Sequence, residues 1–315
     1  MTSGGGDVLV LRALGLGDAL TGVPALRGVR RAWPGRWLTL AAPLAVGSWL
    51  RDLGVVDDVL DTHGLDAALP WRRSGHVAVN LHGSGPQSHE LLRATRPVRL
   101  VGFGGDGPPW RSGEHEVDRW CRLVRSAGGA CDREDLRLEA TGAPRSEEVL
   151  LHPGAASAAR RWPAERWAAL ARILVAGGAP VLLTGGPGEA RLCRQVRDLA
   201  GPEVGVAGQT SLAQLAERVA RARLVVCGDT GVAHVATATG TPSVLLFGPT
   251  SPRLWGPAID TDLHTVLWHG SDAAPGDPHG AVIDPALAAI SVDEVAEAAA
   301  ALLAHHPDTA SRASG

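Results

Sequence analysis

The segment CGDTGVAHVATATGTPSVLLFGPTSPRLWGP, residues 227–257, decides the fold class of this chain. Its first residue ends the apolar run Leu224–Cys227, which predicts a buried strand, and the segment continues through Gly-Asp-Thr-Gly into small residues that favour a helix. A second apolar run ends in Phe247-Gly248-Pro249-Thr250. Glycine lets backbone N–H groups come close to an anion, and a helix N-terminus adds partial positive charge. The segment therefore predicts a strand–turn–helix site for a phosphorylated ligand.

The same alternation of short apolar runs and amphipathic stretches occurs in two successive sets. The first set runs from the predicted strand Val8–Leu11 to the predicted helix Glu116–Ser126, and the second from Val149–Leu151 to Val292–Leu303. Strands that alternate with helices in this way build parallel sheets with helices on their faces. We therefore expect an α/β protein with two doubly wound domains that bind ligands at the carboxyl ends of their strands.

A short stretch with glycine and proline, Thr141–Pro144, separates the two sets and is the best candidate for a linker. It predicts an N-terminal domain of residues 1–144 and a C-terminal domain of residues 145–315. A length of 315 residues suits two domains of this size, each with a core of its own.

Composition restricts the partners and the compartment. The formal net charge of −3 gives no overall basic field to attract nucleic acid, and the chain has no lysine, so its fixed cations are arginines. The four cysteines form no CxxC pair and fit free thiols in a reducing cytosol. Arg12 and Asp18 interrupt the N-terminal apolar stretch, and no uncharged run is long enough to span a bilayer. We expect a cytoplasmic protein without an integral membrane segment.

Three segments, in this order along the chain, match a known family: VLVLRALGLGDALTGVPAL at residues 8–26, LHPGAASAARRWPAERWAAL at residues 151–170 and GDTGVAHVATATGTPSVLLFGPTSPRLWGP at residues 228–257. Through them the chain resembles glycosyltransferase family 9, whose best-known members are ADP-heptose:lipopolysaccharide heptosyltransferases. The resemblance implies the GT-B architecture, in which two Rossmann-like domains face a central cleft, the N-terminal one for the acceptor and the C-terminal one for the nucleotide-sugar donor. It also implies inverting, metal-independent transfer of a sugar, such as heptose, from an NDP-sugar, such as ADP-heptose, to an acceptor hydroxyl, without a cofactor.

Arg160 and Arg161 precede Trp162-Pro163, where members of the family often carry lysine. The resemblance implies that one of the two arginines binds the leaving diphosphate, and Arg160 aligns slightly better. Arginine suits this role because its fixed charge and paired donors match phosphate oxygens. The alternative is an exposed charge pair in front of a helix. The sequence has no basic patch directed at lipid A, so a surface glycan and a small natural-product intermediate stay open as acceptors beside lipopolysaccharide.

Asp18 is the candidate catalytic base. It ends the predicted turn Gly15–Asp18 after the first strand and precedes the predicted helix Ala19–Ala32. Inverting transfer needs a base for the proton of the acceptor hydroxyl, and the resemblance implies this role for Asp18. The alternative is an N-cap for the helix that follows. Arg12 and Gly17 are candidate supports, and Arg12 is expected to steady Asp18, to touch the diphosphate or to be a solvated charge at the strand end.

Asp229, Thr230, Gly231 and His234 lie on the predicted turn and the first helical turn of the third segment. The N–H groups of Thr230 and Gly231 are expected to bind phosphate, and Asp229 to accept hydrogen bonds from sugar hydroxyls. His234 lies one helical turn after Thr230 and is expected to donate to phosphate or sugar. A helix cap is the alternative for Asp229, and a satisfied core histidine is the alternative for His234.

Glu189 follows the glycine-rich turn Gly185–Gly188 and is a candidate to bind the ribose hydroxyls of the donor, as acids do in other Rossmann-like units. The alternative is an acid that favours a helix N-terminus. Thr250 either lines the donor cleft or only completes a turn. The segment His269–His279 carries histidine and aspartate residues whose spacing matches no metal motif, so we expect no metal site.

Two other classes of function stay open. A nucleotide-sugar epimerase or hydrolase shares the GT-B shape but needs no acceptor, and a non-catalytic nucleotide-binding protein needs no base. An NAD-dependent oxidoreductase is disfavoured because Gly15–Asp18 lacks the full GxGxxG fingerprint.

Overall fold

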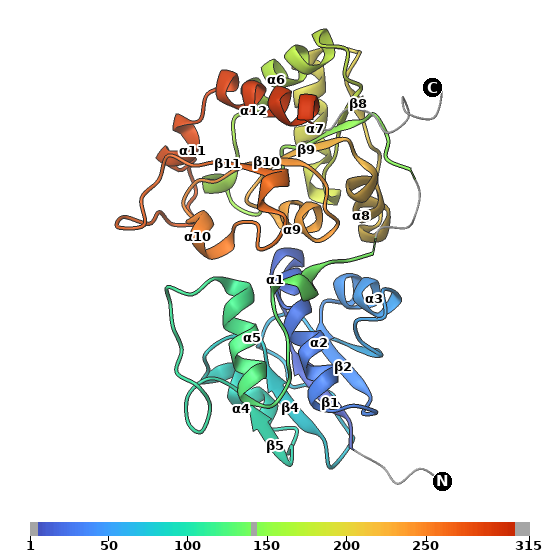
Figure 1. Ribbon diagram of the computed structural model, residues 1–315, viewed down its shortest axis with the longest axis vertical. Helices are drawn as coiled ribbons and strands as arrows, with labels where there is room; N and C mark the ends of the chain where they lie inside the picture. The colour runs from blue at the N-terminus through green and yellow to red at the C-terminus, as the bar shows by residue number, and fades with distance from the viewer. Residues whose placement is uncertain (1–5, 140–143, 306–315) are drawn as a thin grey trace. The chain divides into compact units, whose positions relative to one another are not determined.

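The computed structural model describes residues 6–139 and 144–305 (Figure 1). The chain divides into two compact units, Met1–Leu136 and Arg137–Gly315, which we call the N-terminal and the C-terminal unit. The division falls before the boundary expected at Pro144. Residues 141–143 of the expected linker lie outside the described residues.

The N-terminal unit is a five-stranded parallel sheet with strand order β3-β2-β1-β4-β5. Its strands are β1 (Val8–Leu11), β2 (Leu38–Ala42), β3 (Asp58–Asp61), β4 (Val77–Asn80) and β5 (Arg99–Val101). Its helices are α1 (Leu16–Thr21), α2 (Val23–Ala32), α3 (Leu44–Asp52), α4 (Gln87–Arg93), α5 (Glu116–Ser126) and the 3₁₀ turn η1 (Arg133–Leu136). Helices α2 and α5 pack against each other (Figure 1). The strand order reverses between β1 and β4, which makes their carboxyl ends the switch point where doubly wound sheets bind ligands.

The C-terminal unit is a six-stranded parallel sheet with strand order β11-β10-β9-β6-β7-β8. Its strands are β6 (Val149–His152), β7 (Val181–Leu183), β8 (Gly205–Val206), β9 (Leu224–Gly228), β10 (Ser243–Leu246) and β11 (His264–Leu267). Its helices are α6 (Ala164–Ala176), α7 (Ala190–Ala200), α8 (Leu212–Arg221), α9 (Gly231–Ala238), α10 (Pro252–Trp255), α11 (Pro285–Ala289) and α12 (Val292–His305), with 3₁₀ turns η2 (Ala158–Arg160), η3 (Pro187–Glu189) and η4 (Thr261–Leu263). The six strands have the Rossmann order, and the switch point lies between β6 and β9.

The central strands of both sheets are completely buried, which accounts for their continuous apolar sequence patterns. Every residue of β1, β6 and β9 is buried, as expected for strands that helices cover on both faces. In the C-terminal core, the Trp162 and Trp167 rings meet edge to face with centroids 5.2 Å apart. Both indoles are buried, so this pair anchors the start of α6 against the core.

The expected helix Ala19–Ala32 is wrong in its bounds. The structure has two helices there, α1 from Leu16 and α2 from Val23, with Gly22 between them. A Cβ atom at Gly22 would lie 2.8 Å from Cδ and Nε of the Arg12 side chain, so only glycine fits this close approach. Pro24 lies in the first turn of α2, where its missing N–H costs nothing.

Among the described residues, no helix combines the length and the apolar character that crossing a membrane requires.

Candidate active site

The switch point of the C-terminal unit brings the third sequence segment to the carboxyl end of β9. Asp229 directly follows this strand and is buried, and Thr230 is the N-cap residue of α9 in an extended conformation, φ −143° and ψ 171°. The side chain of Thr230 makes no capping bond. The first N–H groups of a helix have no acceptor one turn earlier, so a helix start without an N-cap side-chain bond attracts anions.

Arg160 joins this cluster from the 3₁₀ turn η2. Its Nη1 atom lies 3.2 Å from the carbonyl oxygen of Asp229 and 3.8 Å from the Asp229 carboxylate oxygen Oδ2. Its Nε atom is buried and has no hydrogen-bond partner among the described residues. The Arg160 side chain keeps 22% of its surface exposed. A guanidinium held this way faces the helix start and retains unused hydrogen-bonding capacity.

The structure separates the two neighbouring arginines. Arg161 is exposed, and its Nε atom donates to the carbonyl oxygen of Ala155 at 2.8 Å, within the same loop. In the described part of the chain, Arg161 makes no hydrogen bond or ion pair with Asp229, whereas Arg160 does. Of the pair, Arg160 is the one that the fold places beside the start of α9.

Glu189 lies at the same sheet edge. It ends η3 and is the N-cap residue of α7, which fits the alternative of an acid at a helix N-terminus. Its Oε2 atom accepts the N–H of Gly186 at 2.7 Å and lies 3.7 Å from Nε2 of His152, the last residue of β6. A Cβ atom at Gly154 would lie 2.0 Å from Oε1 of Glu189, so the carboxylate rests against the backbone of the loop after β6.

His152 and Thr184 are members of this site that the sequence reasoning missed. His152 Nδ1 lies 3.1 Å from Oγ1 of Thr184, and both residues are buried at the ends of neighbouring strands. Burial lowers the pKa of His152, and the nearby Glu189 carboxylate opposes that shift. The signal was the position of each residue directly after an apolar run, where strand ends of a parallel sheet converge.

His234 and Thr250 complete the expected donor residues. His234 is buried in α9, and its ring meets the Trp255 ring with centroids 6.2 Å apart at 66°. This contact matches the core-packing alternative and also keeps the imidazole near the helix start. Thr250 is half-buried after β10, and the next residue, Ser251, caps α10 through its side chain.

Asp18 lies at the switch point of the N-terminal unit. Its backbone position differs both from the expected turn Gly15–Asp18 and from the expected N-cap. It belongs to the first turn of α1, and the N-cap residue is Gly15, so Asp18 is neither on a loop nor a cap. Its own carbonyl oxygen accepts hydrogen bonds from Nε of Arg12 and, at 2.9 Å, from Oγ1 of Thr21. Gly17 precedes it in the same turn.

Arg12 is almost completely buried, with 1% of its surface exposed, so it is not a solvated charge. Besides Asp18, its guanidinium donates to the carbonyl oxygen of Leu81, to Oγ1 of Thr21 at 3.0 Å and to Oε1 of Glu116 at 3.3 Å. It also lies over the Trp120 ring, 4.8 Å from the centroid. These contacts occupy the guanidinium inside the unit, so Arg12 supports the backbone around Asp18.

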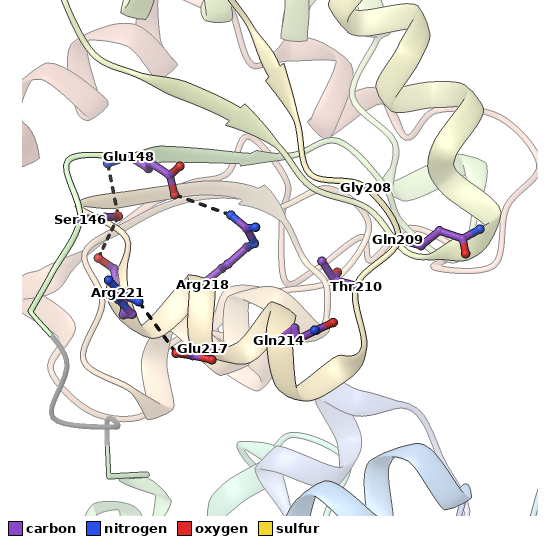
Figure 2. Close-up of a pocket in the computed structure, with 9 residues that line it drawn as sticks. All are labelled: Ser146, Glu148, Gly208, Gln209, Thr210, Gln214, Glu217, Arg218 and Arg221. Carbon is purple, nitrogen blue, oxygen red and sulfur yellow. Dashed lines mark hydrogen bonds and ion pairs between the residues drawn. The ribbon is translucent and has the colours of Figure 1, made fainter.

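One cavity lies away from both switch points. It has a volume of about 630 Å³ and lies beside α8, between this helix, the segment before β6 and the loop after β8 (Figure 2). Figure 2 shows its charged side chains in pairs: Arg218 faces Glu148 at 4.0 Å and Arg221 faces Glu217 at 3.9 Å. Charges that neutralise one another in this way leave no side chain poised for catalysis, and we assign no chemistry to the cavity.

No group of three histidine, cysteine, aspartate or glutamate side chains is placed to hold a metal ion in residues 6–139 and 144–305. In the segment His269–His279, His269 instead pairs with Glu294, 2.8 Å away on α12.

Comparison with known proteins identifies the family. Residues 111–275, more than half of the chain, match the family described as glycosyltransferase family 9 (heptosyltransferase). The chain belongs to glycosyltransferase family 9. The expected family and the expected class of enzyme are thereby confirmed.

Relatives in this family carry heptosyltransferase names. Lipooligosaccharide heptosyltransferase 2 of Haemophilus influenzae is 34% identical over 107 residues, which is 32% of this chain and 31% of that protein. Lipopolysaccharide heptosyltransferase 1 of Pseudomonas aeruginosa is 28% identical over 309 residues, which is 82% of each. The first alignment therefore spans less than a third of its relative, whereas the second spans most of it.

The solved structure of E. coli ADP-heptose lps heptosyltransferase II has a TM-score of 0.73 with this family 9 chain at 19% identity. The likeness covers 95% of this chain and 99% of that one. It confirms the GT-B class of fold, with two Rossmann-like parallel-sheet domains.

Proposed function

We propose that this family 9 protein is an inverting, metal-independent glycosyltransferase that moves a heptose from an ADP-heptose donor to an acceptor hydroxyl. The observation that carries the proposal is the group at the β6/β9 switch point, which consists of the partly exposed Arg160 side chain, the buried Asp229 carboxylate and the start of α9. Relatives named heptosyltransferases, and a structural neighbour named for ADP-heptose, support the choice of donor.

In this proposal the C-terminal unit binds the donor. As the glycosidic bond breaks, negative charge builds on the β-phosphate, and Arg160 together with the N–H groups of Thr230 and Gly231 holds that charge. A fixed guanidinium and a helix start supply the positive potential that a cation supplies in other enzymes. Asp229 accepts hydrogen bonds from sugar hydroxyls, and Glu189 accepts from the ribose.

The N-terminal unit supplies the acceptor side. Asp18 takes the proton of the acceptor hydroxyl while the oxygen attacks the anomeric carbon and the nucleoside diphosphate leaves. A single displacement of this kind inverts the configuration at that carbon. A positioned general base contributes roughly 10²–10⁴-fold to the rate. Support comes from the place of Asp18 in the first turn of α1, beside the β1/β4 switch point.

We further propose a cytoplasmic enzyme that acts on a glycan or a small molecule with free hydroxyls. Nucleotide-sugars are made in the cytoplasm, and the four described cysteines are free buried thiols that suit a reducing compartment. The relatives are named for lipopolysaccharide, which makes a delipidated lipopolysaccharide core oligosaccharide the first acceptor to test, with a 2-deoxystreptamine aminoglycoside as the second.

The test is product analysis with and without an acceptor. The protein is incubated with ADP-heptose alone and with each acceptor, and ADP release and product mass are followed. We expect ADP and a heptosylated acceptor only when both substrates are present. An isomerised donor, or free heptose released equally fast without acceptor, would show an epimerase or a hydrolase instead. Tight ADP binding without any turnover on either acceptor would favour a non-catalytic nucleotide-binding protein.

A further inference from the structure

The loop after β4 holds its backbone through the buried side chain of Asn80. Asn80 Oδ1 accepts the N–H of His82 at 3.0 Å, and its Nδ2 atom donates to the carbonyl oxygen of Gly83 at 3.1 Å and to Oγ of Ser88 at 2.8 Å. Asn80 itself is fully buried at the end of the strand. The position of His82 is therefore set by the sheet and not by solvent.

Arg12 ties this loop to the turn that carries Asp18. One guanidinium donates both to the carbonyl oxygen of Leu81 and to the carbonyl oxygen of Asp18. The residue after Leu81 is His82, so the imidazole and the Asp18 turn flank the same buried group. Since β1 and β4 are neighbours in the sheet, both side chains lie at the β1/β4 switch point.

The two nitrogens of the half-buried His82 ring differ. Nδ1 is enclosed and has no hydrogen-bond partner among the described residues, whereas Nε2 is not enclosed in this way. Burial, and then the Arg12 charge, lower the pKa of His82, so the ring is neutral at pH 7 and carries a single N–H. A proton on Nδ1 would be an unsatisfied buried donor in a ring that already lies near the Arg12 charge. The proton therefore resides on Nε2.

We propose that His82 is an acceptor-binding residue, whose Nε2–H donates a hydrogen bond to an acceptor oxygen next to the hydroxyl that Asp18 deprotonates. This inference rests on the proposed function and adds to it the group that orients the acceptor. No proton is transferred by His82. It binds a neutral oxygen or a carboxylate of a sugar, and it leaves the donor untouched because it belongs to the N-terminal unit.

The experiment compares His82→Leu, His82→Gln and His82→Asn, with His63→Leu as a matched control. His63 is an exposed histidine of the same unit that pairs with Asp61 at 3.2 Å. Initial rates are measured with ADP-heptose and the acceptor that the wild type uses, and ADP affinity is measured by calorimetry. Loss of one hydrogen bond raises the acceptor KM of His82→Leu about tenfold. The kcat and the ADP affinity of His82→Leu stay within about twofold of wild type. Its melting temperature stays within a few degrees of wild type, on the order of what about 1 kcal/mol shifts.

Rescue identifies the nitrogen. The amide nitrogen of glutamine reaches the place of Nε2, so His82→Gln recovers most of the acceptor KM, while His82→Asn places its amide near Nδ1 and does not. If the wild type transfers sugar, the proposed function holds. If His82→Leu then has an unchanged acceptor KM, the inference about His82 is overturned. A joint loss of kcat, melting temperature and ADP affinity also overturns it, since that pattern shows a structural role. If the wild type transfers no sugar, the proposed function falls and this inference falls with it.

Discussion

The two switch points have the same strand order, and each carries an arginine after its first strand, but the two arginines are held in opposite ways. Arg12 is buried, and its guanidinium is occupied by carbonyl oxygens, a hydroxyl and the carboxylate of Glu116. Arg160 keeps 22% of its side chain exposed and leaves its Nε atom without a partner among the described residues. Burial and counter-charge, rather than topology or residue type, decide which arginine supports a fold and which meets a ligand.

The difference has an energetic side. Removing one partner of a buried ion pair leaves an uncompensated charge and costs about 3–5 kcal/mol, whereas an exposed pair contributes about 0–1 kcal/mol. At the N-terminal switch point we therefore expect substitutions to change the free energy of unfolding or the turnover rate. At the C-terminal switch point we expect them to change the affinity for the nucleotide.

The largest expected effect is on turnover, at Asp18. Asp18→Asn keeps the size of the side chain but removes the proton acceptor, so kcat falls by roughly 10²–10⁴. Because α1 takes its N-cap from Gly15, the substitution removes no cap, and the melting temperature stays near that of wild type. Stopped assays of ADP release, together with thermal melts, measure both quantities. Near wild-type turnover in a folded Asp18→Asn protein would place the base elsewhere.

The next largest effect is on stability, at Arg12. Arg12→Met leaves Glu116 buried with less compensation and removes one donor each from the carbonyl oxygens of Asp18 and Leu81, which lowers the free energy of unfolding by about 3–5 kcal/mol. Arg31→Met is the control, because Arg31 also pairs with a carboxylate, that of Asp135, but its side chain is 48% exposed. We expect a cost of about 0–1 kcal/mol there. Urea unfolding compares the two, and equal losses would contradict the contrast between buried and exposed arginines.

A smaller effect is expected in nucleotide selectivity, at Glu189. If this carboxylate accepts from the ribose, wild type binds ADP about tenfold more tightly than 2′-deoxy-ADP. Glu189→Gln keeps an oxygen for the N–H of Gly186 but loses charge, so the preference shrinks while the η3 turn persists. Competitive titration gives the ratio of the two dissociation constants. An identical ratio in both proteins would assign Glu189 to the turn alone.

The smallest effect is expected from chelation. With a guanidinium and a helix start at the diphosphate, transfer should proceed at an unchanged rate in EDTA. Rates with EDTA and with added Mg²⁺ or Mn²⁺ make the comparison. Activity that disappears in EDTA and returns with the cation would refute the metal-independent chemistry.

The sequence predicted the central elements because their residues carry the pattern by themselves. The strands β1, β6 and β9 are buried throughout and begin where the continuous apolar runs predicted them, although β6 and β9 each extend one residue beyond the run. Edge strands were harder to recognise: β3 is only partly buried and begins and ends with aspartate, so its four residues form no apolar run.

The site was predictable in its residue types but not in its contacts. The distinction between Arg160 and Arg161 depends on Asp229, which lies 69 residues further along the chain. The pairing of Arg12 with Glu116 spans 104 residues, and the break at Gly22 depends on the same arginine. Contacts of this range arise from the fold, and a local pattern carries no trace of them.

The most direct test of the account is the affinity for ADP of two neighbouring arginine variants. Arg160→Ala and Arg161→Ala are titrated with ADP by calorimetry beside wild type and Asp18→Asn. Loss of a charge-assisted contact of about 1.5–3 kcal/mol raises the dissociation constant of Arg160→Ala for ADP by about tenfold to a hundredfold. Arg161→Ala and Asp18→Asn bind ADP as wild type does, because Arg161 bonds within its own loop and Asp18 belongs to the N-terminal unit. Equal affinity in Arg160→Ala and Arg161→Ala would contradict the assignment of the C-terminal switch point to the donor diphosphate.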